Sequence, residues 1–136
     1  MSERIILDTN IWVSYFIGGK FDEIALTILN NNLTVFSCIE LEKEVNNVLN
    51  RKKFKTLLHL EIDRYLSFLY DLTQSVQIER TFKGCPDEHD DFLFDLAIQT
   101  KSNFLVTGDK RLIAFDTSPI TIISLKAFKE AYPATH

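Results

Sequence analysis

Six acidic side chains stand beside apolar runs or on apolar helical faces, where a folded chain rarely leaves a carboxylate: Asp8, Glu44, Asp87, Asp90, Asp91 and Asp109. Neighbouring carboxylates are tolerated only when they are protonated, paired with cations or bound to a metal ion. Hard oxygen ligands without an accompanying His/Cys cluster select Mg²⁺ or Mn²⁺ over Zn²⁺. A divalent-metal site is the chemistry that these residues favour.

The segment 87–97 contributes three of these acids, and helical periodicity separates them. Asp87 is explained by helix capping and by the helix dipole alone. Asp90 shares its face with apolar residues three, four and seven positions later, so a helix that buries them carries Asp90 toward the core or a crevice. Asp91 lies about 100° further round. Periodicity therefore selects Asp90.

A second helix is predicted from Ser37, which forms a capping-box pattern with Glu40, to Leu49 or Asn50. Glu44 lies at the border of its apolar stripe. A side chain that reaches solvent or finds an ion-pair partner is the simpler explanation for an isolated glutamate there. The other charged residues in the first half of this helix are expected to face solvent: Glu40, Glu42 and Lys43.

The acids must be positioned by elements that alternate along the chain. Strands are predicted at Arg4–Leu7, Leu33–Phe36, Val76–Ile78, Phe104–Val106 and Thr121–Ser124, and helices at Phe21–Asn31, from Ser37, at Lys55–Asp71, and from Asp87 to about Thr100. This order predicts an α/β fold, a three-layer α/β/α sandwich with a mainly parallel sheet of about five strands. Ligands bind such sheets at the carboxyl ends of the strands, where Asp8 and Asp109 follow their strands.

The composition predicts one domain that spans residues 1–136. The chain is 46% hydrophobic, which suits a core that buries about two-thirds of the surface of the unfolded chain. The formal charge of −4 argues against a protein that relies on an overall basic surface. Two cysteines are too few for a disulfide framework. No signal peptide or membrane-spanning run is evident, so we expect a soluble, cytoplasmic protein without a membrane partner.

Four segments, taken in order, resemble the PIN domain nucleases, particularly the small bacterial and archaeal PIN proteins that act as toxins of toxin–antitoxin pairs. They are IILDTN at residues 5–10, LEKEV at 41–45 with its continuation VLNRKKF at 48–54, CPDEHDDFLFDLA at 85–97 and LVTGDKRL at 105–112. The resemblance covers nearly the whole chain, to the strand that ends near Ser124. It implies a PIN-like, Rossmann-like fold.

The resemblance also implies roles for individual residues. Asp8, Glu44, Asp90 and Asp109 match the four acids of the family, and Asn10 and Thr107 match its supporting polar residues. The doublet Asp90–Asp91 stands where Asp-Asn is more usual, and a proline precedes Asp87. The division of labour among Asp87, Asp90 and Asp91 therefore stays open.

The implied activity is metal-dependent hydrolysis of RNA by one or two Mg²⁺ or Mn²⁺ ions. Asp8 and Asp109 would be the main ligands, Asp90 would complete the cluster, and Glu44 would bind a second ion or orient the attacking water. The resemblance further implies a homodimer and, for toxin members, a cognate antitoxin that inserts a segment near the active site.

Basic residues follow two of the acid-bearing segments: Arg51, Lys52 and Lys53 in the first, and Lys110 and Arg111 in the second. They would flank the crevice and contact RNA phosphates, but charge runs are also ordinary solvated surface. Both interpretations stay open.

Two other functions remain in view. A Mg²⁺-dependent phosphoacceptor or phosphatase-like domain would also place an aspartate at a strand end, although it would need a lysine after a later strand, and none stands out. A catalytically silent PIN-like module that binds RNA or protein is the other. Trp12, Tyr15 and Phe16 follow the first acid, and we expect them to pack in the core or a dimer interface rather than to stack on bases.

Overall fold

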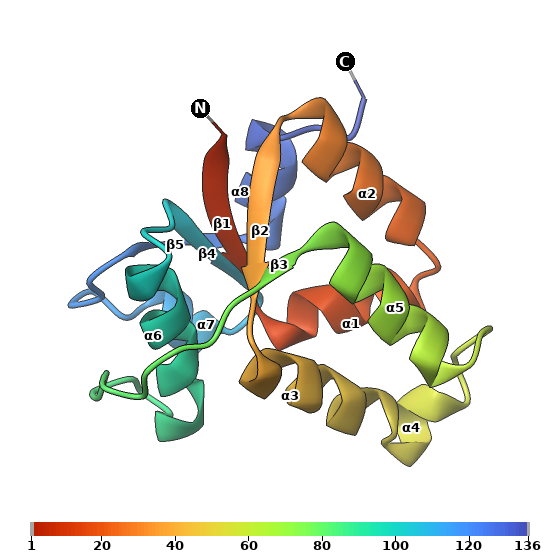
Figure 1. The fold of residues 1–136 in the computed structure, drawn as a ribbon, viewed down its shortest axis with the longest axis horizontal. Helices are drawn as coiled ribbons and strands as arrows, with labels where there is room; N and C mark the ends of the chain where they lie inside the picture. The colour runs from red at the N-terminus through yellow and green to blue at the C-terminus, as the bar shows by residue number, and fades with distance from the viewer. Residues whose placement is uncertain (1, 136) are drawn as a thin grey trace.

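A parallel sheet of five strands lies at the centre of the computed structural model, which describes residues 2–135 (Figure 1). The strands are β1 (Glu3–Leu7), β2 (Leu33–Ser37), β3 (Gln74–Ser75), β4 (Phe104–Thr107) and β5 (Thr121–Ser124), in the spatial order β3-β2-β1-β4-β5. All neighbouring strands pair in parallel. The order reverses at β1, so the crevice for a ligand lies beyond the ends of β1 and β4.

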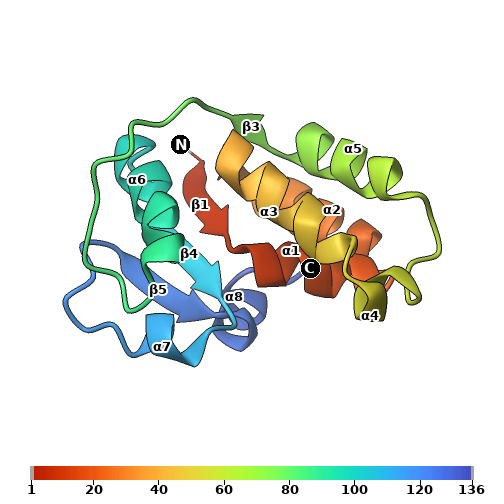
Figure 2. The same cartoon turned by 90° about the horizontal axis from the view of Figure 1, so that it is seen from below.

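Helices flank the sheet. They are α1 (Thr9–Ile17), α2 (Phe21–Asn30), α3 (Ile39–Leu49), α4 (Lys52–Lys55), α5 (Ile62–Leu72), α6 (Asp91–Gln99), α7 (Lys110–Ile113) and α8 (Leu125–Ala131), with a 3₁₀ turn, η1 (Glu88–Asp90), before α6. In Figures 1 and 2, α6 lies on one side of β1 and β4, while α1, α2, α3 and α5 gather on the other side. The three-layer α/β/α fold with a parallel sheet is confirmed.

The first helix was absent from the sequence prediction. Six of the nine residues of α1 are buried, including Trp12, Tyr15 and Phe16. Asn10 and Ser14 are exposed, and apolar residues cover most of the rest of the helix, so the sequence shows no narrow apolar stripe there. The aromatic residues after Asp8 therefore pack in the core, as expected, while the helix that carries them left no periodic signal.

The helix predicted over Lys55–Asp71 is confirmed only in its second part, because α4 ends at Lys55, α5 begins at Ile62, and a loop lies between them. The Tyr65 hydroxyl accepts hydrogen bonds from the backbone N–H groups of His59 (3.1 Å) and Leu60 (3.2 Å). These bonds satisfy the loop amides without a helix. The apolar spacing of this segment reflects the loop side chains Leu58 and Leu60, which pack against the core.

The predicted strand Val76–Ile78 is also misplaced, since β3 consists of Gln74 and Ser75, with one further bond from Val76 N–H to the Ser37 carbonyl (2.9 Å). The capping box from Ser37 is wrong as well. Ser37 is the last residue of β2, and its hydroxyl donates to Glu42 Oε2 (2.8 Å), as does the Ser75 hydroxyl (2.9 Å). Glu42, expected to face solvent, is buried and links β2 to β3.

The sequence prediction also lacked α7, and it extended the helix after Asp87 too far toward the N-terminus. Asp87 caps the 3₁₀ turn η1, where it accepts from the His89 N–H (3.0 Å), and α6 begins only at Asp91. No helix within residues 2–135 combines the length and the apolar character that a membrane span requires.

Candidate active site

A cavity of about 830 Å³ opens between α1 and α3, beyond the carboxyl ends of β1 and β4. Five acidic residues line it: Asp8, Glu44, Asp87, Asp90 and Asp109. Asp8 is the N-cap of α1, Asp109 is the N-cap of α7, and Asp90 ends η1. The fold thus brings all four acids of the predicted site to the wall of one cavity.

Asp8 is held in place from three directions. Its carboxylate is 4% exposed and accepts hydrogen bonds from the Thr107 hydroxyl (2.7 Å), the Thr9 N–H (2.7 Å) and the Asn10 side-chain amide (3.2 Å). Its own N–H donates to the Val106 carbonyl (2.9 Å). The side chain therefore has one orientation, fixed by β4 as well as by its own helix.

One hydrogen bond joins the segment after β4 to the start of α1, and another fixes that segment on the end of β4. The Gly108 N–H donates to Asn10 Oδ1 (3.1 Å), and the Asp109 N–H donates to the Thr107 hydroxyl (3.0 Å). A Cβ on Gly108 would lie 3.4 Å from the same Asn10 oxygen, so a glycine suits this close approach. Asn10 and Thr107 make the contacts expected of supporting residues.

The pKa values of two of these carboxylates, Asp8 and Asp90, are raised, first by burial and then by repulsion from neighbouring carboxylates. Burial raises the pKa of Asp90 to about 7, with added repulsion from Asp8, Asp87, Glu44 and Asp109. Burial also raises the pKa of Asp8 to about 6, against the lowering effect of its hydrogen bonds from Thr107 and Thr9. The cavity is thus a concentration of negative charge without enough cations beside it.

A model of the PIN domain family matches residues 4–111, a range that contains all five acidic residues of the cavity. The chain belongs to the PIN domain family. No curated protein matches it significantly. PIN domains are typically nucleases and generally use divalent metal ions. The family therefore indicates a nuclease-type function, which is that of a hydrolase.

The donors of this PIN domain cavity fit a hard divalent cation, because they are carboxylate oxygens, and burial together with repulsion between carboxylates raises the pKa values of Asp8 and Asp90. Within residues 2–135, no group of three or more Asp, Glu, His or Cys side chains is arranged so that it could hold a metal ion. A complete cage is not required, because Mg²⁺ keeps several waters and binds through one or two carboxylates.

The rim of the PIN domain cavity carries an ion-pair network around Asp87. Its Oδ1 atom lies 3.0 Å from His89 Nδ1, and its Oδ2 atom lies 3.7 Å from Arg111 Nη2, which also lies 3.6 Å from Asp109 Oδ2. The hydrogen bonds with His89 lower the pKa of Asp87 and raise that of His89. Asp87 is therefore compensated by cations, unlike Asp90.

Asp91 turns away from the cavity. It is buried, and it accepts a hydrogen bond from the Cys85 N–H (3.1 Å). Asp95, one helical turn later, accepts from the N–H groups of Thr81 (3.0 Å) and Phe82 (2.8 Å). Both carboxylates attach the loop before η1 to α6, a role that has no signature in the sequence because the donors are backbone groups.

The predicted basic residues also divide into those that reach the cavity and those that lie outside it. Arg51 lines the cavity, and Arg111 reaches its rim through the ion pairs with Asp87 and Asp109. Lys52, Lys53 and Lys110 are exposed and lie outside the lining. Sequence reasoning missed other residues that line the cavity, because they are ordinary polar or apolar types: Ser14, Asn47 and Phe54.

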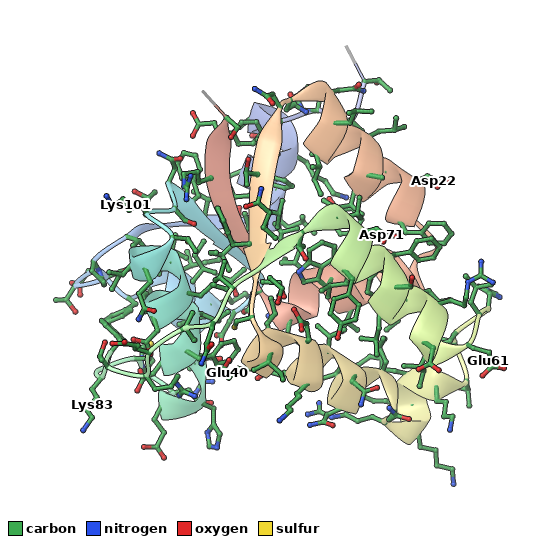
Figure 3. All side chains as sticks on the ribbon, viewed as in Figure 1. Asp22, Glu40, Glu61, Asp71, Lys83 and Lys101 are labelled. Atoms are coloured by element: carbon green, nitrogen blue, oxygen red, sulfur yellow. The ribbon has the colours of Figure 1, made fainter. Side chains whose placement is uncertain are left out.

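A second hollow of about 590 Å³ adjoins the first along α3, and the two share Glu44, Asn47 and His89. Lys43, Arg80 and Lys83 line its outer part. Figure 3 shows Glu40 at the start of α3 and Lys83 projecting outward from the loop before α6. Arg80 is held between Glu40 (3.9 Å) and Asp95 (3.5 Å), so its charge is already compensated.

Proposed function

We propose that the protein is a metal-dependent endoribonuclease that hydrolyses phosphodiester bonds of RNA, with Mg²⁺ or Mn²⁺ as its cofactor. One observation carries this proposal: Asp8, Glu44, Asp90 and Asp109, spread between residues 8 and 109, line one cavity of a PIN domain. Carboxylates of a core or a plain surface have no reason to gather in this way.

Three of the acids would hold the ion, directly or through water: Asp8, Asp90 and Asp109. When bound, a divalent ion supplies positive charge to a phosphate oxygen and lowers the pKa of a water molecule. Asp8 has the most constrained position of the three, because Thr107, Thr9 and Asn10 all donate to its carboxylate. This constraint preorganises the site for its ligand.

Glu44 comes from the opposite wall, on α3. It is half-buried, and we assign it to orient the attacking water or to bind a second ion. Arg111 and Arg51 supply guanidinium groups at the rim and at the far wall of the cavity. Arginine binds phosphate through two parallel hydrogen bonds, so these residues would hold the phosphates of the RNA against the acids.

The biological role that we propose is that of a cytoplasmic toxin in a toxin–antitoxin pair, active as a homodimer and inhibited by a cognate antitoxin protein. Its support is the resemblance of the four acid-bearing segments to small PIN toxins. The thiols of Cys38 and Cys85 are free, which suits a reducing compartment. A continuous core built from β1, β2, β4 and their helices supports one domain over residues 1–136.

The test is cleavage of single-stranded RNA by the wild type and by Asp8→Asn with Mn²⁺, followed by sequencing of the new RNA ends. The wild type should cut, and chelation of the metal should stop it. Asp8→Asn should fold but not cut. Asp22→Asn is the matched control, because Asp22 is an exposed acid at the start of α2 (Figure 3) that does not line the cavity.

Two results would overturn the proposal. Cleavage by Asp8→Asn at the wild-type rate would remove the acid cluster from the reaction. RNA binding by the wild type without any metal-dependent cleavage would instead favour a silent binding module.

A further inference from the structure

Three hollows join one another across the C-terminal end of α1. The acid cavity shares Ser14 and Gly18 with a smaller hollow of about 170 Å³. That hollow shares Leu125 and Lys129 of α8 with a third hollow of about 430 Å³. Hollows that share wall residues lie side by side, so a continuous depression leads from the acids over the end of α1 to α8. We call its two outer hollows the α8 track.

The turn after α1 brings a lysine to this track. Gly19 has a φ of 66°, and its N–H donates to the Phe16 carbonyl (3.1 Å). The Lys20 N–H donates to the Tyr15 carbonyl (2.8 Å). These two bonds form the Schellman motif that ends many helices, and the motif turns the chain back so that Lys20 lines the smaller hollow. Lys20 is exposed, and it has no ion-pair partner in the part of the chain that the structure describes.

Lys129 is held beside the same hollow by two contacts. Its Nζ atom lies 5.4 Å from the ring centroid of Tyr15 and 3.6 Å from Glu23 Oε2. The distance to Glu23 is longer than a hydrogen bond, and an ammonium group carries three N–H donors. Lys129 is therefore fixed in position but can still donate to a phosphate oxygen. It belongs to α8, which lies outside the range 4–111 that the family model matches.

Charge distinguishes the α8 track from the hollow along α3, on the other side of the cavity. Of the residues that the structure describes, three lysines and one acid line the α8 track: Lys20, Lys126, Lys129 and Glu130. The hollow along α3 is lined by four acids, Glu40, Glu44, Glu88 and Asp91, and by the basic residues Lys43, Arg80, Lys83 and His89. Arg80 is already paired there. A polyanion is therefore attracted to the α8 track rather than to the hollow along α3.

We propose that RNA bound at the acids continues past the end of α1 along the α8 track, where Lys20 and Lys129 contact its phosphates. The inference rests on the proposed function and names the path of the substrate. Asp8 and Gly18 are the two caps of α1, so about 15 Å of helix separates the acids from the start of the track. The two lysines thus hold phosphates other than the reacting one, and they add affinity without taking part in the cleavage step.

The test measures binding of a fluorescein-labelled single-stranded RNA by anisotropy at several salt concentrations. An Asp8→Asn parent in a chelating buffer keeps the RNA intact. Adding Lys20→Gln and Lys129→Gln together should reduce the slope of log K against log [salt] by about 1.4, at about 0.7 for each lost phosphate contact on a single strand. The matched control adds Lys43→Gln and Lys83→Gln, which remove two charges from the hollow along α3. Its slope should stay close to that of the parent.

A second pair of substitutions separates charge from packing, because Lys129→Gln also breaks the contact with Glu23. Lys20→Arg with Lys129→Arg keeps both positive charges, and the slope should equal that of the parent. Three results would overturn the track. They are equal slopes for the two glutamine pairs, a larger loss for the Lys43 and Lys83 pair, and a loss for the arginine pair as large as for Lys20→Gln with Lys129→Gln.

The two proposals fail differently. If the wild type cuts RNA with metal but the slope does not depend on Lys20 and Lys129, the nuclease stands and the track is wrong. If the wild type does not cut RNA but the slope still depends on these two lysines, the track stands as a binding surface and the nuclease is wrong.

Discussion

The inward-facing carboxylates of this chain form two sets: an architectural set, whose members are bonded to donors of the protein, and a cavity set, whose members line the proposed active site. Asp91, Asp95 and Glu42 are buried and bonded to N–H or hydroxyl donors of the protein. Asp8 and Asp90 have other carboxylates among their neighbours, and the pKa values of both are raised. A buried acid with donors around it stabilises the fold, whereas a buried acid among acids costs stability unless a ligand compensates its charge.

Asp8 has features of both sets. It accepts three hydrogen bonds, like the architectural acids, but burial, with added repulsion from Glu44 and Asp109, still raises its pKa. The bonds fix the orientation of the carboxylate without neutralising the charge. This combination is what a metal ligand requires, because the ion must find an oriented oxygen whose charge is still available.

The largest expected effect is on activity. Asp109→Asn should reduce the rate of RNA cleavage by more than about a hundredfold, because a lost metal ligand should cost at least as much as a lost supporting residue. The asparagine can still accept from the Arg111 N–H and cap α7, so the melting temperature should stay close to that of the wild type. Initial rates at saturating Mn²⁺ test this. A fast, stable Asp109→Asn enzyme would put Asp109 in the architectural set.

The architectural set should show the opposite pattern. Asp95→Ala leaves the partly buried amides of Thr81 and Phe82 without their acceptor, and we expect a loss of about 1–3 kcal/mol in the free energy of unfolding. Urea denaturation measures it. Asp22→Ala, at an exposed position, should stay within about 0.5 kcal/mol of the wild type. An equal effect of the two substitutions would contradict the role assigned to Asp95.

The cavity set could be predicted largely from the sequence because the signals of its carboxylates are local. Asp8 and Asp109 each follow a strand of apolar residues, and strand ends meet at one edge of a parallel sheet. Asp90 was selected by helical periodicity. Glu44 needed the resemblance to PIN domains, since its position at a stripe border had a simpler explanation. The strands β1, β2, β4 and β5 were predicted for the same local reasons.

The architectural set could not be predicted, because its donors carry no special residue type and several lie far away in the sequence. The Ser75 hydroxyl, which donates to Glu42, is 33 residues away, and Asp95 accepts from backbone amides 13 and 14 residues before it. The sequence predicted a helix for the loop before α5, but the Tyr65 hydroxyl accepts hydrogen bonds from two backbone amides of this loop, which satisfies them without a helix. In each case a tertiary hydrogen bond decided the outcome, and periodicity carries no information about such bonds.

The pH dependence of stability sharpens the contrast between the sets. Burial, with added repulsion from neighbouring carboxylates, raises the pKa of Asp90 in the folded, metal-free protein from its usual 3.8 to about 7. The folded state therefore holds more protons than the unfolded state between these pH values, and this group makes stability fall as the pH rises through that range. Asp90→Asn should stabilise the metal-free protein at pH 8 by roughly 1–2 kcal/mol, reduced by partial solvent screening, and change little at pH 4.

Thermal unfolding of both proteins in a chelating buffer at the two pH values tests this expectation. Adding Mn²⁺ at pH 8 should then stabilise the wild type more than Asp90→Asn, because only the wild type has the full charge for the ion to compensate. A wild type that is more stable than Asp90→Asn at pH 8 without metal would mean that Asp90 is not held among uncompensated charges.

The smallest effect should come from Glu42, where the charge itself can be removed while its oxygen stays. Glu42→Gln keeps one acceptor for the hydroxyls of Ser37 and Ser75, and these hydroxyls can also accept from the new amide. We expect a loss of about 1 kcal/mol, the difference between a charge-assisted and a neutral hydrogen bond. Glu40→Gln removes a more exposed carboxylate with a 3.9 Å contact to Arg80 and should cost less. Urea denaturation compares them. A gain in stability for Glu42→Gln would show that Glu42 carries an uncompensated charge, as Asp90 does, and the division between the two sets would then fail at this residue.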